Sequence, residues 1–298
     1  MHEQKSAQKT KLIWVLKALS ILLIAASVIS VMIAYSRSKK DAVVAFLDVG
    51  QGDAIYIRSS DTDILIDGGA TADVIEKLSK EMPFFDKTIE LMVMTHADAD
   101  HAVGLVEVMK RYEVLKVIES GITCHKELCQ EWERIIDEKG IDREFVYAGK
   151  EYVLPEGRLT VVHPIVSHAG MTVDDMNEAS VVTCLTLRGK SFLLTGDLGV
   201  ENERKLVEQD NGGLCMDALA LKAGHHGSKH SSSEEIIEYT NPEYTIISAG
   251  KDNSFGHPHY EVITRFSEYT IPLIETAKSG TIRFVLAEDG SYEIKTDR

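Results

Sequence analysis

Four side chains that commonly bind metal ions fall within six consecutive positions of this sequence. They are His96, Asp98, Asp100 and His101 in the segment THADADHAVGL, directly after an apolar, strand-like run at 89–94. Their spacing cannot place all four on one face of a strand or helix, so we expect them to lie around a loop at the strand's end. Such a loop could hold a divalent cation. The alternative is a solvated acidic turn before the next helix, which explains fewer of the four residues.

Strand and helix signals alternate after residue 41, without an internal repeat or a Pro-, Ser- or Gly-rich break, which predicts one compact domain at 42–298. So many strands mixed with helices predict two sheets packed face to face with helices on both outer sides, a four-layer αββα sandwich of the α/β class. The expected strands are 43–49, 53–57, 64–66, 89–94, 115–118, 159–163, 181–187, 192–194, 218–222, 244–248, 273–275 and 281–286. The expected helices are 71–81, 103–112, 126–139, 200–209, 233–239 and 260–268.

Further ligand-type residues also follow predicted strands. Asp67 follows 64–66, Asp197 follows 192–194, and His225 and His226 follow 218–222. Loops at one end of a rigid sheet scaffold can converge on one site, so we expect these residues to meet the His/Asp loop.

The start of the chain differs in composition from the rest. Residues 1–17 are basic, 18–35 carry no charged side chain, and 36–41 form a linker. An uncharged run of this length is about what crosses a bilayer as a helix, so we expect a single-pass anchor bound to the lipid bilayer through 18–35. A cleaved signal peptide and a buried core helix are the alternatives. A signal-peptide core is usually about 7–15 residues long, and no convincing small-x-small cleavage site precedes Arg37.

Charge is unevenly distributed. Four lysines precede the uncharged run and three basic residues follow it, which favours a cytoplasmic N-terminus and a large domain outside the cytoplasm. Residues 1–40 hold seven Lys and Arg and one acid, so a formal charge of −15 for the chain leaves −21 for 41–298. This acidity serves solubility and gives no general attraction for nucleic acid, which metal ions or local cations would have to supply.

The four cysteines are too few for a disulfide scaffold in a domain of this size. Cys124 and Cys129 could pair if the domain is exported, whereas Cys184 and Cys215 lie in apolar, strand-like runs. A zinc site made of Cys124, His125 and Cys129 would lack a fourth ligand.

Six motifs span roughly residues 42–290: FLDVGQGDAIYI, ILIDGG, THADADHAVGL, FLLTGDL, LKAGHHGS and GHPH. In this order and at these separations they resemble the metallo-β-lactamase superfamily and, more narrowly, the nuclease-like C-terminal domain of ComEC-type competence proteins. The resemblance implies a metallo-β-lactamase-like fold and a metal-dependent hydrolase. It does not extend to the multi-helix channel of those proteins, because a single anchor helix cannot line a DNA pore.

The resemblance also implies two adjacent divalent ions, which would activate water and clamp the attacking and leaving oxygens of a phosphodiester. Asp67 would fix a ligand histidine from behind. The implied ligands are His96 and Asp98 for the first ion, Asp100, His101 and His226 for the second, and Asp197 between them. The implied catalytic residues are Asp100, His226 and His257.

Two departures from the superfamily pattern bear on the metal. Asp98 replaces the usual second histidine, and the stretch expected to hold a third histidine contains Asn177 and Ser180 instead. The ComEC-type branch shares both features. More oxygen donors shift the preference from zinc toward manganese or magnesium. His163 and His168 are rival third ligands, although a histidine such as His163, before a proline, is more often packed at a strand end.

The segment LKAGHHGSKHSSS surrounds His226 with Lys222, His225, Lys229 and His230, a cationic patch that could bind phosphate near Ser228. The alternative is that 231–233 cap the next helix and Lys222 ends a strand. The candidate substrate-binding residues are His225, Ser228, Lys229, Gln51, Asn177 and His259.

Two further motifs could border the same pocket. His257 and His259 in FGHPHY could protonate a leaving group or hold phosphate, or could simply shape a loop around Pro258. Gln51 and Asp53 in GQGD could line the pocket, or could form a turn between two strands.

Three hypotheses of function follow. The first is an anchored metal-dependent phosphodiesterase or nuclease acting on single-stranded DNA or another phosphodiester outside the cytoplasm, with manganese, zinc or magnesium. The second keeps the hydrolase and changes the substrate to a lactone, a thioester or a small phosphodiester. The third is a membrane-tethered binding module without catalysis, which is disfavoured because unused buried ligands cost stability.

Overall fold

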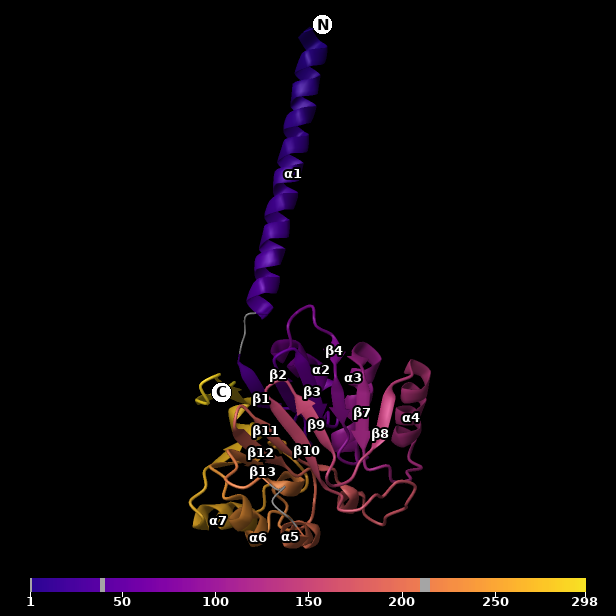
Figure 1. The fold of residues 1–298 in the computed structure, drawn as a ribbon, viewed down its shortest axis with the longest axis vertical. Helices are drawn as coiled ribbons and strands as arrows, with labels where there is room; N and C mark the ends of the chain where they lie inside the picture. The colour runs from indigo at the N-terminus through magenta and orange to yellow at the C-terminus, as the bar shows by residue number, and fades with distance from the viewer. Residues whose placement is uncertain (1, 38–40, 210–214) are drawn as a thin grey trace. The chain divides into compact units, whose positions relative to one another are not determined.

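The computed structural model describes residues 2–37, 41–209 and 215–298, with side chains placed for 11–32 of the first helix (Figure 1). The contacts divide the chain into two units, Met1–Lys40 and Asp41–Arg298. The first unit contains a single long helix, α1 (His2–Arg37). Its segment Lys11–Met32 is long and apolar enough to cross a membrane. The expected span 18–35 overlaps this segment, and residues 38–40 of the expected linker lie outside the described residues.

The larger of the two main sheets has antiparallel strands at one side and parallel strands at the other. In spatial order its strands are β17 (Tyr292–Thr296), β16 (Ile282–Leu286), β1 (Ala42–Phe46), β2 (Ile55–Ser59), β3 (Thr62–Ile66), β5 (Leu91–Val93), β7 (Lys116–Glu119) and β8 (Asp142–Phe145).

The second main sheet is parallel from β12 to β15 and antiparallel elsewhere. Its strands, in spatial order, are β15 (Leu273–Glu275), β14 (Tyr244–Ile247), β13 (Ala220–Lys222), β12 (Lys190–Leu194), β11 (Val182–Leu187), β10 (Gly157–His163) and β9 (Glu151–Leu154). Two short strands, β4 (Thr88–Ile89) and β6 (Glu113–Val114), form a separate pair.

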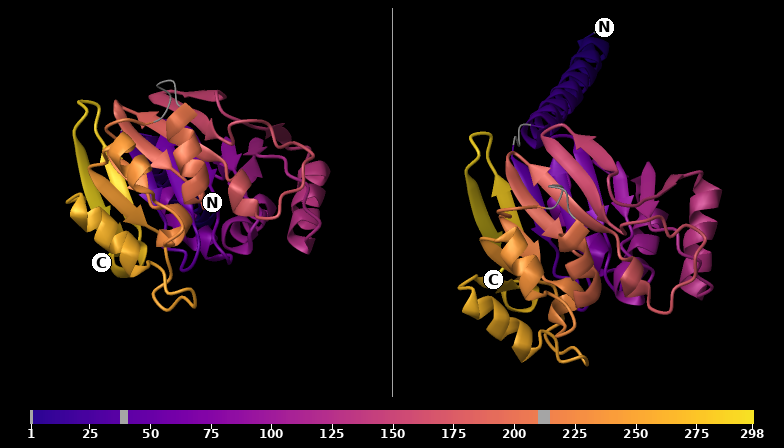
Figure 2. Two further views of the ribbon diagram at one scale, coloured as in Figure 1. Left: turned by 90° about the horizontal axis from the view of Figure 1, so that it is seen from below. Right: turned by 60° about the horizontal axis from the view of Figure 1, so that its bottom comes forward.

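Helices cover the outer side of each sheet (Figure 2). The first sheet carries α2 (Asp73–Glu81), α3 (Ala99–Arg111) and α4 (Glu127–Lys139). The second carries α5 (Val200–Gln209), α6 (Glu234–Thr240) and α7 (Tyr260–Glu268). The remaining helical turns are η1 (Met176–Ala179), η2 (Gly224–Gly227) and α8 (Thr276–Ser279).

Strand alternation explains why the protein has three apolar cores. In and just after β1, Val44 and Phe46 belong to the core between the sheets, whereas Ala45 and Leu47 belong to the core beneath the first set of helices. The phenyl ring of Phe284 packs edge-on against Phe46 and Phe192 and joins the two sheets. A third core lies between the second sheet and its helices. The predicted four-layer α/β fold is therefore confirmed.

Some element boundaries differ from those expected. The run 89–94 extends over β4 and β5, which belong to different sheets, and β6, β8, β9 and β17 were not predicted. The helix expected at 103–112 begins at Ala99, so Asp100 and His101 lie on its first turn with Asp98 as the N-cap. The expectation that all four residues of the His/Asp motif lie in a loop is therefore wrong for these two.

Candidate metal centre

Close backbone contacts bring two loops of the first sheet against the start of α3 at the site. A Cβ on Gly52 would lie 2.0 Å from the Asp100 carbonyl oxygen, and one on Gly104 would lie 1.8 Å from that of Gly68. Only glycine permits these approaches. The amide of Gly68 also donates to the His101 carbonyl at 2.8 Å. Gly68 and Gly104 thus let the loop that carries Asp67 pack directly against α3.

Four donor residues from three parts of the chain converge on one point: α3, the loop after β12 and η2. The Nε2 atoms of His101 and His226 lie 3.2 Å apart, and Asp197 Oδ2 lies 3.3 Å from each of them. Asp100 Oδ2 lies 3.4 Å from His226 Nε2. Four donors about 2.0–2.1 Å from one ion at tetrahedral angles would be about 3.3–3.4 Å apart. The mutual spacing of His101, His226 and Asp197 therefore fits one divalent ion, and Asp100 lies beside His226 as a further donor.

The two histidines of this cluster are oriented by contacts at their Nδ1 atoms, on the side of the ring away from the other donors. Asp67, at φ 56° and fully buried, accepts from Thr95 and lies 2.7 Å from His101 Nδ1 through its Oδ2 atom. His226 Nδ1 lies 2.9 Å from the Ser248 carbonyl oxygen. Each contact places the ring proton on Nδ1 and leaves Nε2 free to bind a cation. Asp67 thus lies where the sequence comparison put it.

His96 and Asp98 lie beside this cluster. His96 Nε2 is buried, has no hydrogen-bond partner among the described residues, and lies 3.7 Å from Asp98 Oδ2. It can join His101 and Asp197 in a second group of donors. Asp98 is part-exposed, and its other oxygen, Oδ1, is 2.7 Å from Lys126 Nζ.

The histidines and carboxylates of the centre shift one another's pKa values. Burial alone would lower the pKa of His101 and of His226, but Asp197 and other carboxylates raise both well above the usual value. Burial and the charge of His101 lower the pKa of His96 to about 4. Burial would raise the pKa of Asp197, but the two histidines hold it well below its usual range. Protons on His101 and His226 thus supply the positive charge that the carboxylates need, a role that a metal ion can take over.

Asp53 and Lys222 form a buried ion pair that sequence reasoning did not predict. Asp53 Oδ2 lies 2.8 Å from Lys222 Nζ, and both side chains are almost fully buried. The other Asp53 oxygen lies 3.4 Å from His226 Nδ1 and has no hydrogen-bond partner. Asp53 could therefore also join Asp197 and His226 as a ligand. Lys222 does not belong to an exposed cationic patch, which corrects that expectation.

The double histidine lies in a strained turn. His225 and His226 both have positive φ, 46° and 56°. This turn aims the His226 ring at the cluster, while His225 Nε2 lies 3.6 Å from Asp197 Oδ2 and is about one-third exposed. Ser228 is buried and its Oγ accepts from the His230 amide, whereas the Lys229 side chain is exposed.

The next three serines shape the same loop. Ser233 caps α6, and Ser231 Oγ donates to the carbonyl of Gly224. These contacts match the capping alternative for this segment.

His257 is the outer neighbour of the centre. Its ring centroid lies 5.6 Å from that of His225 and 6.3 Å from that of His226. His259 caps the start of α7, and its Nδ1 accepts from the Lys229 amide. Burial and the nearby histidines lower the pKa of His257 to about 4.

Two of the remaining candidates present unpaired polar atoms. Gln51 Oε1 accepts from the Gly250 amide, while its Nε2 is buried without a partner. Asn177 Oδ1 on η1 is also buried without a partner. Neither residue belongs to a group of metal donors among the residues described.

The rival third ligands lie elsewhere. His163 is buried with Nδ1 2.7 Å from the Ser180 carbonyl oxygen, so it is a packed strand end. Neither it nor His168 joins a donor group within the described parts of the chain.

All four cysteines are in disulfides, Cys124–Cys129 and Cys184–Cys215. The first fits the pairing considered for an exported domain and excludes a zinc site that uses those thiolates. The second was not predicted.

The donor set fits a divalent ion for two reasons. It combines imidazole nitrogens with carboxylate oxygens at coordination spacing, and it leaves His96 Nε2, Asp197 Oδ1 and Asp53 Oδ1 buried without hydrogen-bond partners. Buried polar atoms without partners are costly, and a bound cation would satisfy them.

The fold is similar to that of solved structures. The metallo-beta-lactamase fold protein YhfI from Bacillus subtilis matches 82% of this chain and 100% of its own, with a TM-score of 0.53 and 13% identity. CmlA, a diiron beta-hydroxylase from Streptomyces venezuelae, matches 84% of this chain and 54% of its own, with a TM-score of 0.51 and 12% identity. At these identities the likeness shows the fold alone.

Sequence relatives are closer. ComE operon protein 3 of Bacillus subtilis is 28% identical over 284 residues, which cover 88% of this chain and 35% of the relative. Recombination protein 2 of Haemophilus influenzae is 30% identical over 262 residues, 85% of this chain and 30% of the relative. Competence protein ComA of Neisseria gonorrhoeae is 28% identical over 258 residues, which cover 85% of this chain and 33% of the relative. The chain thus spans roughly a third of the length of these relatives.

These relatives confirm the expected resemblance to ComEC-type competence proteins. Residues 47–251, more than half of the chain, match the profile of the Metallo-beta-lactamase superfamily. With its fold and its His/Asp motifs in place, the chain belongs to the metallo-beta-lactamase superfamily.

Proposed function

We propose that this chain is a membrane-anchored, metal-dependent phosphodiesterase that cleaves DNA outside the cytoplasm. The convergence of Asp100, His101, Asp197 and His226 at coordination spacing carries the proposal, because the hydrolytic chemistry of the superfamily needs such a centre. DNA is favoured as the substrate because relatives bear the names of a competence protein and a recombination protein.

The proposed ligands are those expected from the motifs, with up to two divalent ions of manganese, zinc or magnesium. When bound, such ions supply Lewis acidity and lower the pKa of water. The chain's own part is to hold the imidazoles in one tautomer through Asp67 and Ser248 and to keep the centre buried. Asp53 is an additional candidate ligand.

Substrate phosphates would lie on the His225–His257 side of the centre. A cavity of about 520 Å³ beside His257 is lined by Lys251, Lys278 and Arg298 and by one acid, Glu275. Lys278 pairs with Glu275 and Arg298 with Asp48, which leaves a small local excess of positive charge in an acidic domain. His257 has a pKa of about 4 and is neutral near pH 7, so before substrate binds one of its ring nitrogens can accept a hydrogen bond while the other donates. The negative charge of a bound phosphate would raise that pKa and let His257 act as a proton donor.

Two observations support a position outside the cytoplasm. Disulfides persist in oxidising compartments, and both cysteine pairs of this domain are bonded. The lysines before the apolar segment favour a cytoplasmic N-terminus for α1.

The test is cleavage of single-stranded DNA by the full chain in detergent, with Mn²⁺, Zn²⁺ or Mg²⁺ and with a chelator. We expect metal-dependent cleavage by the wild type. Asp197→Ala should lose bound metal and activity together, whereas His257→Ala should keep its metal and cleave about 100-fold more slowly. Equal metal loss in the two variants would contradict this division of roles.

A folded, metal-loaded protein that cleaves no DNA with any of these metals would refute the nuclease proposal. Turnover of a lactone, a thioester or a small phosphodiester in the same assay would then identify a small-substrate hydrolase. A folded protein that takes up no metal would indicate a binding module.

A further inference from the structure

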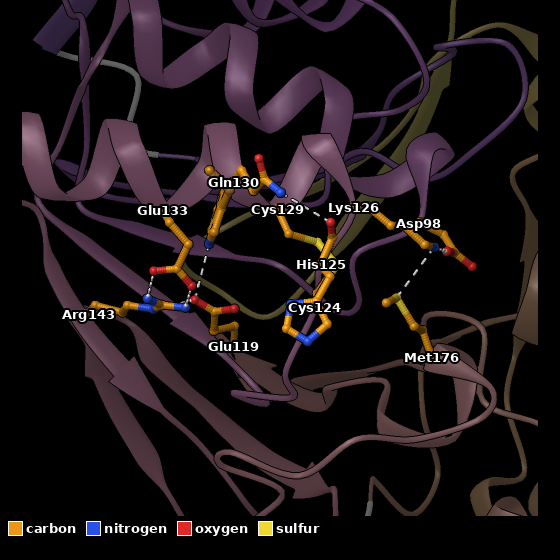
Figure 3. The surroundings of a disulfide bond; sticks show 11 residues. Asp98, Glu119, Cys124, His125, Lys126, Cys129, Gln130, Glu133, Arg143 and Met176 are labelled. Carbon is orange, nitrogen blue, oxygen red and sulfur yellow. Dashed lines mark hydrogen bonds and ion pairs between the residues drawn. A yellow bond between two sulfur atoms is a disulfide. The ribbon is translucent and has the colours of Figure 1, made fainter.

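Lys126 holds one of the expected metal ligands. Its Nζ atom lies 2.7 Å from Asp98 Oδ1 (Figure 3). The other oxygen of the same carboxylate, Oδ2, faces His96 Nε2 at 3.7 Å. The Asp98 carboxylate therefore lies between a fixed positive charge and the imidazole with which it would share a metal ion.

The position of Lys126 is built into the local structure. It is the N-cap residue of α4, and its carbonyl accepts from the amides of Cys129 and Gln130. The Cys124–Cys129 disulfide closes the short segment around it, as Figure 3 shows. At the end of its side chain, Nζ also lies 3.6 Å from Met176 Sδ. The backbone of Lys126 is thus held on both sides, and its ammonium has two neighbours.

The donors beside His96 are few. Among the described residues, Asp98 belongs to none of the groups in which three donors lie close enough to share an ion. His96 joins a group only through His101 and Asp197, and both of these also serve the four-donor cluster. The two candidate ion positions are therefore unequal. One has His101, His226 and Asp197 within 3.3 Å of one another, with Asp100 beside His226, whereas the other relies on shared donors.

We propose that the Lys126 ammonium takes the place of a second metal ion at Asp98, so that the domain binds one divalent ion tightly and any further ion weakly. This inference rests on the metal centre of the proposed function and not on its substrate. In this proposal the tight ion is held by His101, His226 and Asp197, with Asp100 beside His226 as a fourth donor. Lys126 then supplies a permanent positive charge beside that ion.

Exposed ion pairs usually contribute little, because two long side chains must be ordered and water screens their attraction. About half of the Lys126 side chain is exposed. Here the two amide hydrogen bonds to its carbonyl and the disulfide have already ordered its backbone. An incoming divalent ion would also have to bind next to a tethered ammonium, and that repulsion lowers its affinity even where the ammonium swings aside.

The experiment measures metal stoichiometry alone. The metal-free full chain in detergent is titrated with Mn²⁺, and bound metal is counted by equilibrium dialysis with elemental analysis. For the wild type we expect one ion per chain, with any second ion at least about tenfold weaker. Because no substrate is present, the result is independent of whether the protein cleaves DNA.

Four variants separate the contributions. Lys126→Met should leave the first ion unchanged and tighten the second by about tenfold or more, because Asp98 is released and a positive charge is removed. Lys126→Arg should restore the wild-type pattern. Asp98→Asn should keep the tight ion. Lys110→Met is the matched control. Lys110 is similarly exposed, and its Nζ lies 2.9 Å from Glu107 Oε1, in an ion pair that does not involve the metal centre. This variant should bind both ions as the wild type does.

Two ions of equal affinity in the wild type would overturn the proposal. So would an unchanged second ion in Lys126→Met, or loss of the tight ion in Asp98→Asn.

Discussion

At the scale of single residues, Asp67 shows how a side chain that binds no metal can control one that does. Its Oδ2 atom lies 2.7 Å from His101 Nδ1 and also accepts from Thr95. It therefore determines which nitrogen of His101 carries the proton. The same logic applies to His226, whose Nδ1 lies 2.9 Å from a backbone carbonyl.

Replacing Asp67 by Asn should weaken metal binding by about 10- to 100-fold while keeping the fold. The amide would present a donor to His101 Nδ1, which would move the ring proton to Nε2 and block the atom that binds the ion. Metal affinity is measured by titration of the metal-free protein, with the exposed Asp61→Asn as the control. Unchanged affinity in Asp67→Asn would show that Asp67 does not set the tautomer.

His163 predicts a loss of stability in acid. Burial lowers its pKa to about 4, whereas the unfolded chain has the ordinary value of about 6.5. Protons therefore bind preferentially to the unfolded state, and stability falls as the pH drops from about 6.5 to about 4. Between pH 7 and pH 5, the free energy of unfolding of His163→Gln should fall by about 2 kcal/mol less than that of the wild type.

Denaturant unfolding at the two pH values checks this. The exposed His125→Gln should behave like the wild type, and equal acid sensitivity in all three proteins would contradict the prediction.

Residue chemistry alone identified most of the candidate centre. Clustered His and Asp residues after strands pointed to His96, Asp100, His101, Asp197 and His226, which lie together in the structure. The sequence could not predict the Asp53–Lys222 pair, because nothing in the segments around these two residues indicates that their charges are buried. It also could not find Lys126, whose meeting with Asp98 depends on how α4 packs beside α3.

At the scale of elements, the site depends on backbone contacts that exclude side chains. Gly104 lies inside α3, where Ala in place of Gly normally stabilises a helix by about 1 kcal/mol. Here a Cβ would lie 1.8 Å from the Gly68 carbonyl oxygen. Gly104→Ala should therefore destabilise the domain by about 1–3 kcal/mol, the reverse of the usual sign.

Chemical denaturation measures the effect. Gly199→Ala is the control, since the nearest atom to its Cβ would be 3.6 Å away, and it should stay within about 0.5 kcal/mol of the wild type. A stabilised Gly104→Ala would show that the loop carrying Asp67 can move away from α3.

Periodicity predicted the buried elements better than the edge ones. The central strands have apolar runs, whereas β8 reads DREF and β17 reads YEIKT, with mostly part-exposed or exposed side chains. Edge strands such as these are defined by pairing with a neighbour, which a local pattern does not contain. The early start of α3 was missed for a related reason, because His and Asp residues in its first turn look like loop residues.

At the scale of the whole molecule, a strongly apolar helix and an acidic domain are joined in one chain. The domain builds its three cores from its own residues. We therefore expect a variant that lacks 1–40 to keep the thermal unfolding midpoint of the domain. It should remain in solution when mixed with phospholipid vesicles, whereas the full chain should float with them. Flotation of both proteins would place the membrane contact in the domain instead.

The buried pair of Asp53 and Lys222 constrains how this protein can evolve. Losing either partner leaves an uncompensated charge in the interior, which typically costs about 3–5 kcal/mol, a large share of the stability of an ordinary domain. A lineage cannot pass through that intermediate by neutral drift. We therefore expect homologues of this protein either to keep both residues or to replace both. An alignment of such homologues should show that the two positions covary.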